Sequence, residues 1–358
     1  MIGIDVQTGE QLSEIDGAPG TITGLAVDGA VLYTMDTANT LRAISLVGTT
    51  PALIGALVLP GGGNGLVVGD GIATVAAGDV SGNGGYVTVD VSDPTKPKLL
   101  AGDTVRGSAG NALALNGSGL GLFAGNIALF AQGLVPELDV INTSDPGNTA
   151  NRVGRFLLPA TPGGVAISGG LGYVADGTAG LQVVRYQAFV PNTVAPTITV
   201  TTAPGATATE GADAAIGVQI ATPGQILSTE VLLNGVSVLT DLKYPFDLSV
   251  ALPTIAANGG TAVTLAVRAT DTNGNVTTTA PIAVTLVPDV APPALVSATV
   301  SNGAVISTDT HTLRFTFNKP LQAGAASGAA FVLTDGPGAV IAPTTIALTA
   351  DGRTVQAT

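Results

Sequence analysis

The chain has 358 residues, 46% hydrophobic and 10% charged, so it is long enough for two or three domains with buried cores. Its 25 acidic and 12 basic residues give a formal charge of -13, and a field of that sign repels phosphate backbones and anionic lipid surfaces. Nucleic acid is therefore not expected as a partner. The absence of cysteine excludes disulfides and thiolate metal sites, and it fits a bacterial exported protein that folds without an oxidation step.

The composition predicts an all-β fold with many turns. Aromatic residues make up only 4% of the chain, there are 49 Gly and 22 Pro, and no segment combines helix formers at a period of 3.6 residues. The N-terminus lacks the pattern of a signal peptide, so either the chain is a fragment or export uses another signal. Residues 109–136 carry no charge, but Gly and Asn divide them into strand-length pieces, so we expect no membrane insertion.

The first half of the chain contains a repeating unit. Residues 2–16 predict two strands joined by a turn, which correspond to the outer half of a propeller blade. A short apolar strand with Gly turns then recurs at residues 24–33, 65–74, 112–117 and 164–167. The spacing of about 40 to 50 residues is typical of four strands per blade. The sequence therefore predicts a β-propeller of about four blades, or part of a larger propeller.

Two of these units carry a family resemblance. The sequence Leu-Gly-Tyr-Val-Ala-Asp-Gly at residues 171–177 with Gly-Leu-Gln-Val-Val at 180–184, and Val-Asp-Val-Ser-Asp-Pro-Thr-Lys-Pro at 89–97, resembles the LVIVP repeat of bacterial surface β-propellers. The resemblance covers about residues 1–187; the copy at 45–51 is degenerate and the loop 123–136 departs from the pattern by an insertion. It implies a propeller at the cell surface and supplies no catalytic residues.

Two Pro-rich linkers, residues 190–196 and 287–293, divide the rest of the chain. We predict a propeller over residues 1–190, an immunoglobulin-like β-sandwich over 194–288 and a second, truncated immunoglobulin-like module over 291–358. The sandwich strands are expected at residues 197–201, 214–221, 228–233, 246–251, 261–270 and 282–286. Residues 267–277 resemble the penultimate hairpin of bacterial immunoglobulin-like modules, and residues 292–333 resemble the module of S-layer and other bacterial surface proteins.

Two candidate sites lie in these C-terminal modules. His311 is the only histidine. Along the predicted strand it lies on the same face as Leu313, Phe315 and Phe317, which predicts a structural residue at the end of a buried strand face. The oxygen-bearing side chains of Asp271, Asn273 and Asn275 alternate as in a calcium loop. The glutamate that closes an EF-hand loop is absent, so a hairpin turn is the favoured interpretation and a calcium site the alternative.

The candidates in the first half favour structural roles. The Gly-rich residues 61–65 precede a strand and lack a following Lys-Ser or Lys-Thr, so they predict a loop between blades rather than a phosphate site. The Ser-Asp-Pro motifs at residues 92–94 and 144–146 predict side-chain-capped turns. Asp103, Glu137 and Asp139 are too isolated in the sequence to indicate a glycosidase pair.

These patterns predict a non-enzymatic, secreted or cell-surface protein that acts in adhesion, display or extracellular assembly. Its expected partners are other surface proteins, glycans or further domains of the same polypeptide, and we identify no catalytic, cofactor-binding or metal-binding residue. The alternative is an extracellular hydrolase or lyase with its active site at the mouth of the propeller channel.

Pairing of residues 2–16 with the sheet that contains residues 181–184 would close a four-bladed ring. In the other arrangement, the chain begins inside a larger propeller.

Overall fold

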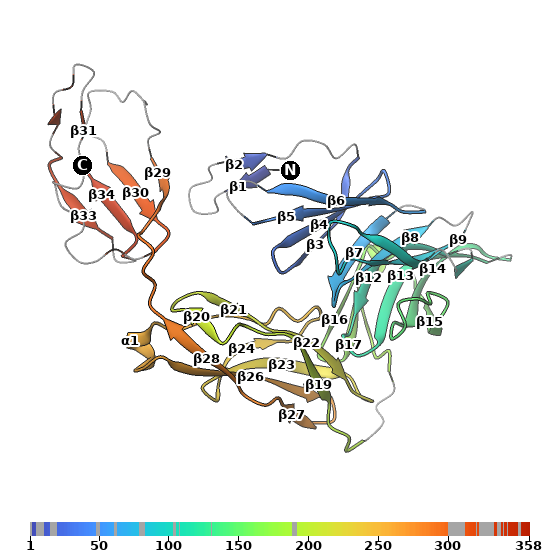
Figure 1. Ribbon diagram of the computed structural model, residues 1–358. Helices are drawn as coiled ribbons and strands as arrows, with labels where there is room; N and C mark the ends of the chain where they lie inside the picture. Colours follow the sequence, from blue (N-terminus) through green and yellow to red (C-terminus); the bar gives the residue numbers. More distant parts are fainter. Residues whose placement is uncertain are drawn as a thin grey trace. The chain divides into compact units, whose positions relative to one another are not determined.

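The computed structural model divides the chain into two compact units, Met1–Pro288 and Asp289–Thr358 (Figure 1). It describes residues 2–4, 11–14, 20–47, 51–60, 63–78, 83–102, 105–106, 108–129, 131–187, 192–299, 312–319, 321, 333–334, 338, 340–341, 343–349 and 352–358. Over these residues, the regular elements are β-strands apart from the short helix α1 (Ile255–Asn258) and one 3-10 turn (Gly177–Ala179). The all-β prediction is confirmed.

Four antiparallel sheets follow one another between residues 22 and 184, and in each the main strands pair in chain order. Sheet I contains β3 (Ile22–Asp28), β4 (Val31–Asp36), β5 (Thr40–Ser45) and β6 (Ala52–Val58). Sheet II contains β7 (Gly63–Gly69), β8 (Ile72–Gly78), β9 (Asn83–Asp90) and β10 (Lys98–Gly102), and β11 (Val105–Arg106) also pairs with β9. Sheet III contains β12 (Ser108–Leu115), β13 (Leu120–Leu129), β14 (Gly133–Asn142) and β15 (Arg152–Leu157). Sheet IV contains β16 (Gly164–Ser168), β17 (Leu171–Ala175) and β18 (Leu181–Val184).

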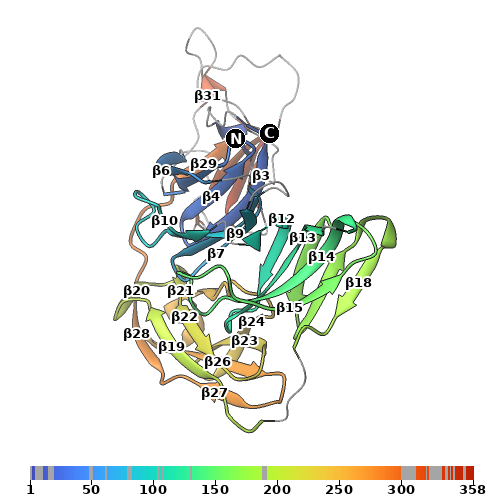
Figure 2. The same cartoon turned by 90° about the vertical axis from the view of Figure 1, so that its right-hand side faces the viewer.

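The first strands of successive sheets, β3, β7, β12 and β16, lie side by side (Figures 1 and 2). Small residues at their contacts permit this close approach. A Cβ added to Gly24 would lie 2.9 Å from the Cβ of Leu66, and one added to Gly65 would lie 3.3 Å from the Cα of Ala112. The repeated apolar units predicted at residues 24, 65, 112 and 164 thus correspond to the strands through which the sheets contact each other.

Separate apolar layers fill the spaces between the sheets. Met35, Leu41, Val68 and Val87 belong to a layer between sheets I and II. Tyr86, Leu113 and Phe123 belong to a layer between sheets II and III, and Leu122, Leu138, Ile167 and Val174 to one between sheets III and IV. Because side chains alternate along a strand, one strand supplies both layers, as β13 does with Leu122 and Phe123.

Sheet IV differs from the other three sheets because it has three strands. Over the described residues, its third strand, β18, pairs only with β17, and the hairpin formed by β1 (Ile2–Ile4) and β2 (Gln11–Glu14) pairs with no other strand. Among the described residues, the pairing that would close a four-bladed ring is therefore not present. Residues 123–136, which the sequence suggested to be an inserted loop, instead belong mostly to β13 and β14, and the two strands pair over ten positions as a long hairpin.

Residues 192–288 form two layers of strands around one core. One layer contains the pair β19 (Thr197–Thr202) and β22 (Gly217–Ala221) and the pair β21 (Asp213–Ala215) and β25 (Ser249–Ala251). The larger sheet has the order β20 (Thr207–Thr209), β28 (Ile282–Val287), β26 (Ala262–Asp271), β23 (Ile226–Leu233) and β24 (Val236–Asp241), with β27 (Val276–Thr278) on β26. Val263, Leu265, Val267 and Ala269 of β26 are buried in the shared core, as the alternation of that segment predicted.

The second unit contains a sheet of order β29-β30-β34-β33. These strands are β29 (Leu295–Ala298), β30 (Leu313–Phe317), β34 (Thr354–Ala357) and β33 (Ile346–Leu348), and β31 (Leu333–Thr334) pairs separately with β32 (Val340–Ile341). Within the described ranges of the chain, no helix has the length and apolar character that crossing a membrane requires.

Candidate functional site

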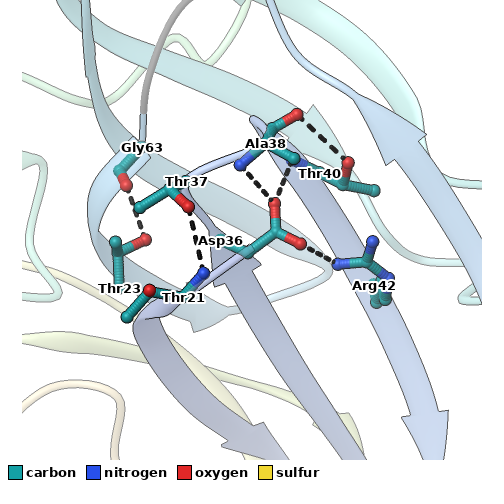
Figure 3. A network of polar contacts seen from close by, with 8 residues as sticks. All are labelled: Thr21, Thr23, Asp36, Thr37, Ala38, Thr40, Arg42 and Gly63. Carbon is teal, nitrogen blue, oxygen red and sulfur yellow. Dashed lines mark hydrogen bonds and ion pairs between the residues drawn. The ribbon is translucent and has the colours of Figure 1, made fainter. Parts of the chain in front are cut away.

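Asp36 is a fully buried aspartate at the turn between β4 and β5 (Figure 3). Its Oδ1 accepts hydrogen bonds from the backbone N of Ala38 at 2.9 Å and of Thr40 at 3.0 Å, while its Oδ2 pairs with Arg42. Burial by itself raises the pKa of this carboxyl, but the hydrogen bonds from Arg42, Thr40 and Ala38 outweigh burial and lower its pKa below the ordinary value. The carboxylate is a turn cap, and its charge is already compensated.

Asp176 occupies the equivalent turn of sheet IV. Arg42 pairs across the strands with Thr34, two residues before Asp36, and Gln182 pairs with Val174, two residues before Asp176. Gln182 therefore lies where sheet I has an arginine. Its Nε2 donates instead to the carbonyl of Ala179 at 3.3 Å.

This difference leaves one carboxylate oxygen of Asp176 without a partner. Asp176 is fully buried, and its Oδ1 accepts a hydrogen bond from the backbone N of Ala160 at 3.2 Å. Its Oδ2 is buried and has no hydrogen-bond partner among the described residues. An unpartnered buried polar oxygen is unusual in a folded protein, so this turn is a weak point of sheet IV.

Glu137 and Asp139, which the sequence did not connect, lie together on one face of β14, and both are buried. Arg155 of β15 contacts the two carboxylates: its Nε lies 2.5 Å from Glu137 Oε2, and its Nε and Nη2 donate to Asp139 at 2.8 and 3.0 Å. Arg152 lies 3.6 Å from Asp139. The two acids thus share Arg155, and with Arg152 they form a structural ion-pair cluster rather than an acid and a base separated by a substrate. Asp103 lies outside the described residues.

The Ser-Asp-Pro turns are capped by side chains, as predicted. Ser92 donates its backbone N and its hydroxyl to Asp90 Oδ1, and Ser144 makes the same two bonds to Asn142 Oδ1. Asp145 Oδ1 then accepts from the backbone N of Gly147 at 2.9 Å. The side chain two residues before each serine is thus the cap, and these turns have a structural role.

The segment with alternating oxygens is a turn built on Asp271, which is fully buried. Asp271 Oδ1 accepts the backbone N atoms of Asn273 and Asn275, each at 2.9 Å, and its Oδ2 accepts the Asn275 side chain at 3.0 Å. Gly274 has a φ of +81°, as a tight turn of this kind favours. Both carboxylate oxygens are therefore used by the turn itself. Among the described residues, no three His, Cys, Asp or Glu side chains gather as a metal ion requires.

The prediction of a loop for the Gly-rich segment is wrong for residues 63–65, which belong to β7. Asn64 Nδ2 donates to the carbonyl of Gly110 in β12 at 2.8 Å. This segment therefore joins neighbouring sheets, whereas Gly61 and Gly62 lie outside the described residues. His311 also lies outside them.

The repeat sheets contact residues 192–288 through Tyr244. Its hydroxyl donates to Asp70 Oδ2 at 3.1 Å, and its ring meets that of Phe246 edge to face at 5.7 Å between centroids. A Cβ on Gly69 would lie 2.4 Å from the Tyr244 hydroxyl, and one on Gly117 would lie 2.6 Å from its ring. Burial, and then the neighbouring Asp70, raise the pKa of Tyr244, so this phenol stays protonated and donates its hydrogen bond.

Two cavities lie between the repeat sheets and residues 192–288, within the first unit, and the first of them includes Asp70 and Tyr244 of this contact. The first, of about 480 Å³, has mostly hydroxyl side chains in its lining, together with the acids Asp70 and Asp145. The second, which we call the glutamine cavity, has a volume of about 620 Å³. Its lining contains the glycine hairpin tip of sheet IV, two glutamines and one arginine: Gly169, Gly170, Leu171, Arg185, Gln187, Pro223, Gly224, Gln225, Leu227, Thr272 and Asn273. The Ser-Asp-Pro motif at residues 144–146 contributes to the first lining, and the turn at residues 271–275 contributes to the second. Neither motif predicted a cavity, because each cavity combines residues from segments far apart in the chain.

A family model described as the LVIVD repeat matches residues 79–102 and 162–184. The chain contains LVIVD repeats. The two matched segments include the two copies on which the sequence resemblance was based, and the family is LVIVD where we expected LVIVP. In the structure, the first LVIVD segment includes β9 and β10 of sheet II, and the second includes the three strands of sheet IV.

The chain is similar to a number of solved structures, three of which are described below. The computationally designed Ika4 protein has a TM-score of 0.37 and 14% identity over 49% of this chain and 98% of its own. The computationally designed Ika8 protein has a TM-score of 0.39 and 11% identity over 76% and 74% of the two chains. BamB from Moraxella catarrhalis has a TM-score of 0.32 and 15% identity over 84% of each chain. No curated protein matches this sequence.

Proposed function

We propose that this chain is a non-enzymatic bacterial cell-surface or secreted protein, in which LVIVD repeats forming a propeller-type array precede immunoglobulin-like sandwich modules. Its role is binding: adhesion, display or extracellular assembly. Its partners are other surface proteins, glycans or further domains of the same polypeptide.

The chemistry of the two cavities carries this proposal. Their linings offer hydroxyls, amides and backbone groups among apolar surface, and such polar groups orient a ligand through hydrogen bonds. Among the described residues, the buried carboxylates of Asp36, Asp139 and Asp271 cap turns or pair with arginine, and Asp176, which keeps an unpartnered oxygen, lies in neither cavity lining. Catalysis by a carboxylate pair needs one group free to give a proton and another free to accept it.

The acidic charge and the absence of cysteine support an extracellular location. Protease treatment of intact cells that express the protein tests this location, and loss of the protein while a cytoplasmic marker survives is the expected result. Full protection of the protein until the cells are lysed would contradict a surface role.

The role in binding is tested with beads coated with the purified chain. They are expected to be retained on bacterial envelopes or extracellular polysaccharide more strongly than beads coated with an unrelated acidic β protein. The same polysaccharides are incubated with soluble protein and assayed for new reducing ends and for unsaturated products. Turnover in this second assay would favour the alternative, an extracellular hydrolase or lyase.

A further inference from the structure

The glutamine cavity contains polar groups that the protein itself does not satisfy. Gln225 is only 5% exposed, and its Oε1 is buried with no hydrogen-bond partner among the described residues. The Oε1 of Gln187 is also buried and unpartnered. The Nε2 of Gln187 donates to the carbonyl of Pro223 at 3.3 Å, and this bond fixes which end of the amide faces the carbonyl. Because a buried acceptor without a donor is costly, the two oxygens favour a ligand that brings donors.

One charged side chain lines this cavity. Arg185 is exposed and forms no ion pair within the described part of the chain, and no acidic side chain lies in the lining. The nearby Asp271 is buried and already saturated by its own turn. In a chain of charge -13, this cavity therefore offers an uncompensated cation beside two acceptors. A guanidinium recognises a carboxylate through paired, charge-assisted hydrogen bonds.

The rest of the lining contains apolar side chains and glycine backbone. Leu171, Leu227 and Pro223 contribute carbon surface, and the hairpin tip at Gly169 and Gly170 contributes bare backbone. A Cβ on Gly170 would lie 2.8 Å from Thr272 Cγ2 and 2.9 Å from Gln225 Oε1, so a side chain there would occupy the place of the glutamine amide. The volume of about 620 Å³ lies within the range of small-molecule sites.

We propose that the glutamine cavity binds an acidic saccharide, that is, a uronate residue of a glycan. The uronate carboxylate pairs with Arg185, and the hydroxyls of the sugar ring donate to Gln225 and Gln187. The carbon face of the ring packs on the apolar side chains of the lining. A free amino acid fits less well because no carboxylate in the lining receives its ammonium group. This inference rests on the proposed binding function and specifies the glycan class.

Binding is measured by calorimetry with trisaccharides of galacturonate, glucuronate, mannuronate and guluronate, each beside its methyl ester. The ester keeps every ring hydroxyl and removes the charge. At least one acid is expected to bind about ten- to a hundredfold more tightly than its ester, the range of a charge-assisted hydrogen bond. Arg185→Gln is expected to abolish this preference, and Lys243→Gln, which removes an exposed cation outside the lining, is expected to retain it.

The glutamines are tested separately. Gln225→Leu is expected to weaken the acid and the ester by a similar factor, because the hydroxyl contacts are common to both. Gln187→Leu, at a less buried position, repeats this measurement if the first variant melts at a lower temperature than the parent. Ligand binding that is unchanged in both variants would exclude the cavity as the site.

Failure of all four acids to bind would overturn the inference, as would equal affinity for acid and ester. Binding only to a peptide with a free C-terminal carboxylate would overturn it in favour of a protein ligand. Retention of coated beads on envelopes in the absence of uronate binding would leave the proposed function standing and reject the inference alone. Loss of bead retention with uronate binding intact would reject adhesion and keep the site.

Discussion

The unpaired oxygen of Asp176 predicts that Gln182→Arg stabilises the protein. The cross-strand register of Gln182 matches that of Arg42, so an arginine there can reach Asp176 Oδ2 as Arg42 reaches Asp36. A hydrogen bond to a charged group contributes about 1.5–3 kcal/mol, and ordering the arginine side chain removes part of it, which leaves about 1–2 kcal/mol. For a unit of this size, that gain corresponds to roughly 2–4 °C in melting temperature.

Calorimetric melting of the full chain and of the variant measures this shift, with urea unfolding as a second readout. The control is Gln182→Arg in an Asp176→Asn background, where the added arginine has no carboxylate to pair with and the gain is expected to disappear. The reverse change, Arg42→Gln, is expected to destabilise sheet I because Asp36 then loses its cation. An unchanged or lower melting temperature for the single Gln182→Arg variant, with its fold intact, would refute the equivalence of the two turns.

Further outcomes are expected elsewhere in the molecule. Arg155→Met is expected to lower the free energy of unfolding in urea by about 3–5 kcal/mol, because Glu137 and Asp139 remain buried without their main cation. A loss below about 1 kcal/mol would contradict the structural ion-pair cluster. Gly117→Val places a side chain against the Tyr244 ring and is expected to lower the melting temperature. Its control is Gly133→Val, because Gly133 also has a positive φ but an added Cβ there meets nothing within 4 Å, so this variant measures the backbone cost alone. Residues 194–288 are expected to unfold cooperatively when expressed alone because they have their own core, and a featureless melt would count against this. Millimolar calcium is expected to move the melting temperature little, since Asp271 is saturated; a rise of many degrees would indicate a site.

The strands and their grouping could be predicted largely from local pattern. The Gly and Ala residues at 24, 65, 112 and 164 marked the first strands of sheets I to IV, and alternation marked β26. β24 was missed, although Asn234-Gly235, both at positive φ, is a strong hairpin signal directly before it. β20 is three residues long and pairs in parallel with β28, so no local period announces it.

The sites were much less accessible to sequence reasoning. The pairing of Glu137 and Asp139 with Arg155 depends on a cross-strand register that only the folded sheet sets. The glutamine cavity brings together Arg185, which follows β18, Gln225, which precedes β23, and Thr272, which follows β26, and these residues are separated by tens of positions in the sequence. No spacing rule connects such residues. Covering exposed strand edges favours a closed ring, but this preference does not determine which strands pair.

The connection from β18 to β19 also affects how the protein carries mechanical load. Asn192 is held by the turn at residues 271–275, a contact that we call the clasp: Asn275 Nδ2 donates to the Asn192 carbonyl at 3.1 Å and to the Asn192 Oδ1 at 3.2 Å. A pull that separates the sandwich from the repeats therefore reaches this clasp before it reaches the strands. The clasp lies on the same turn that supplies Asn273 to the glutamine cavity, so tension along the chain acts directly on one wall of that cavity.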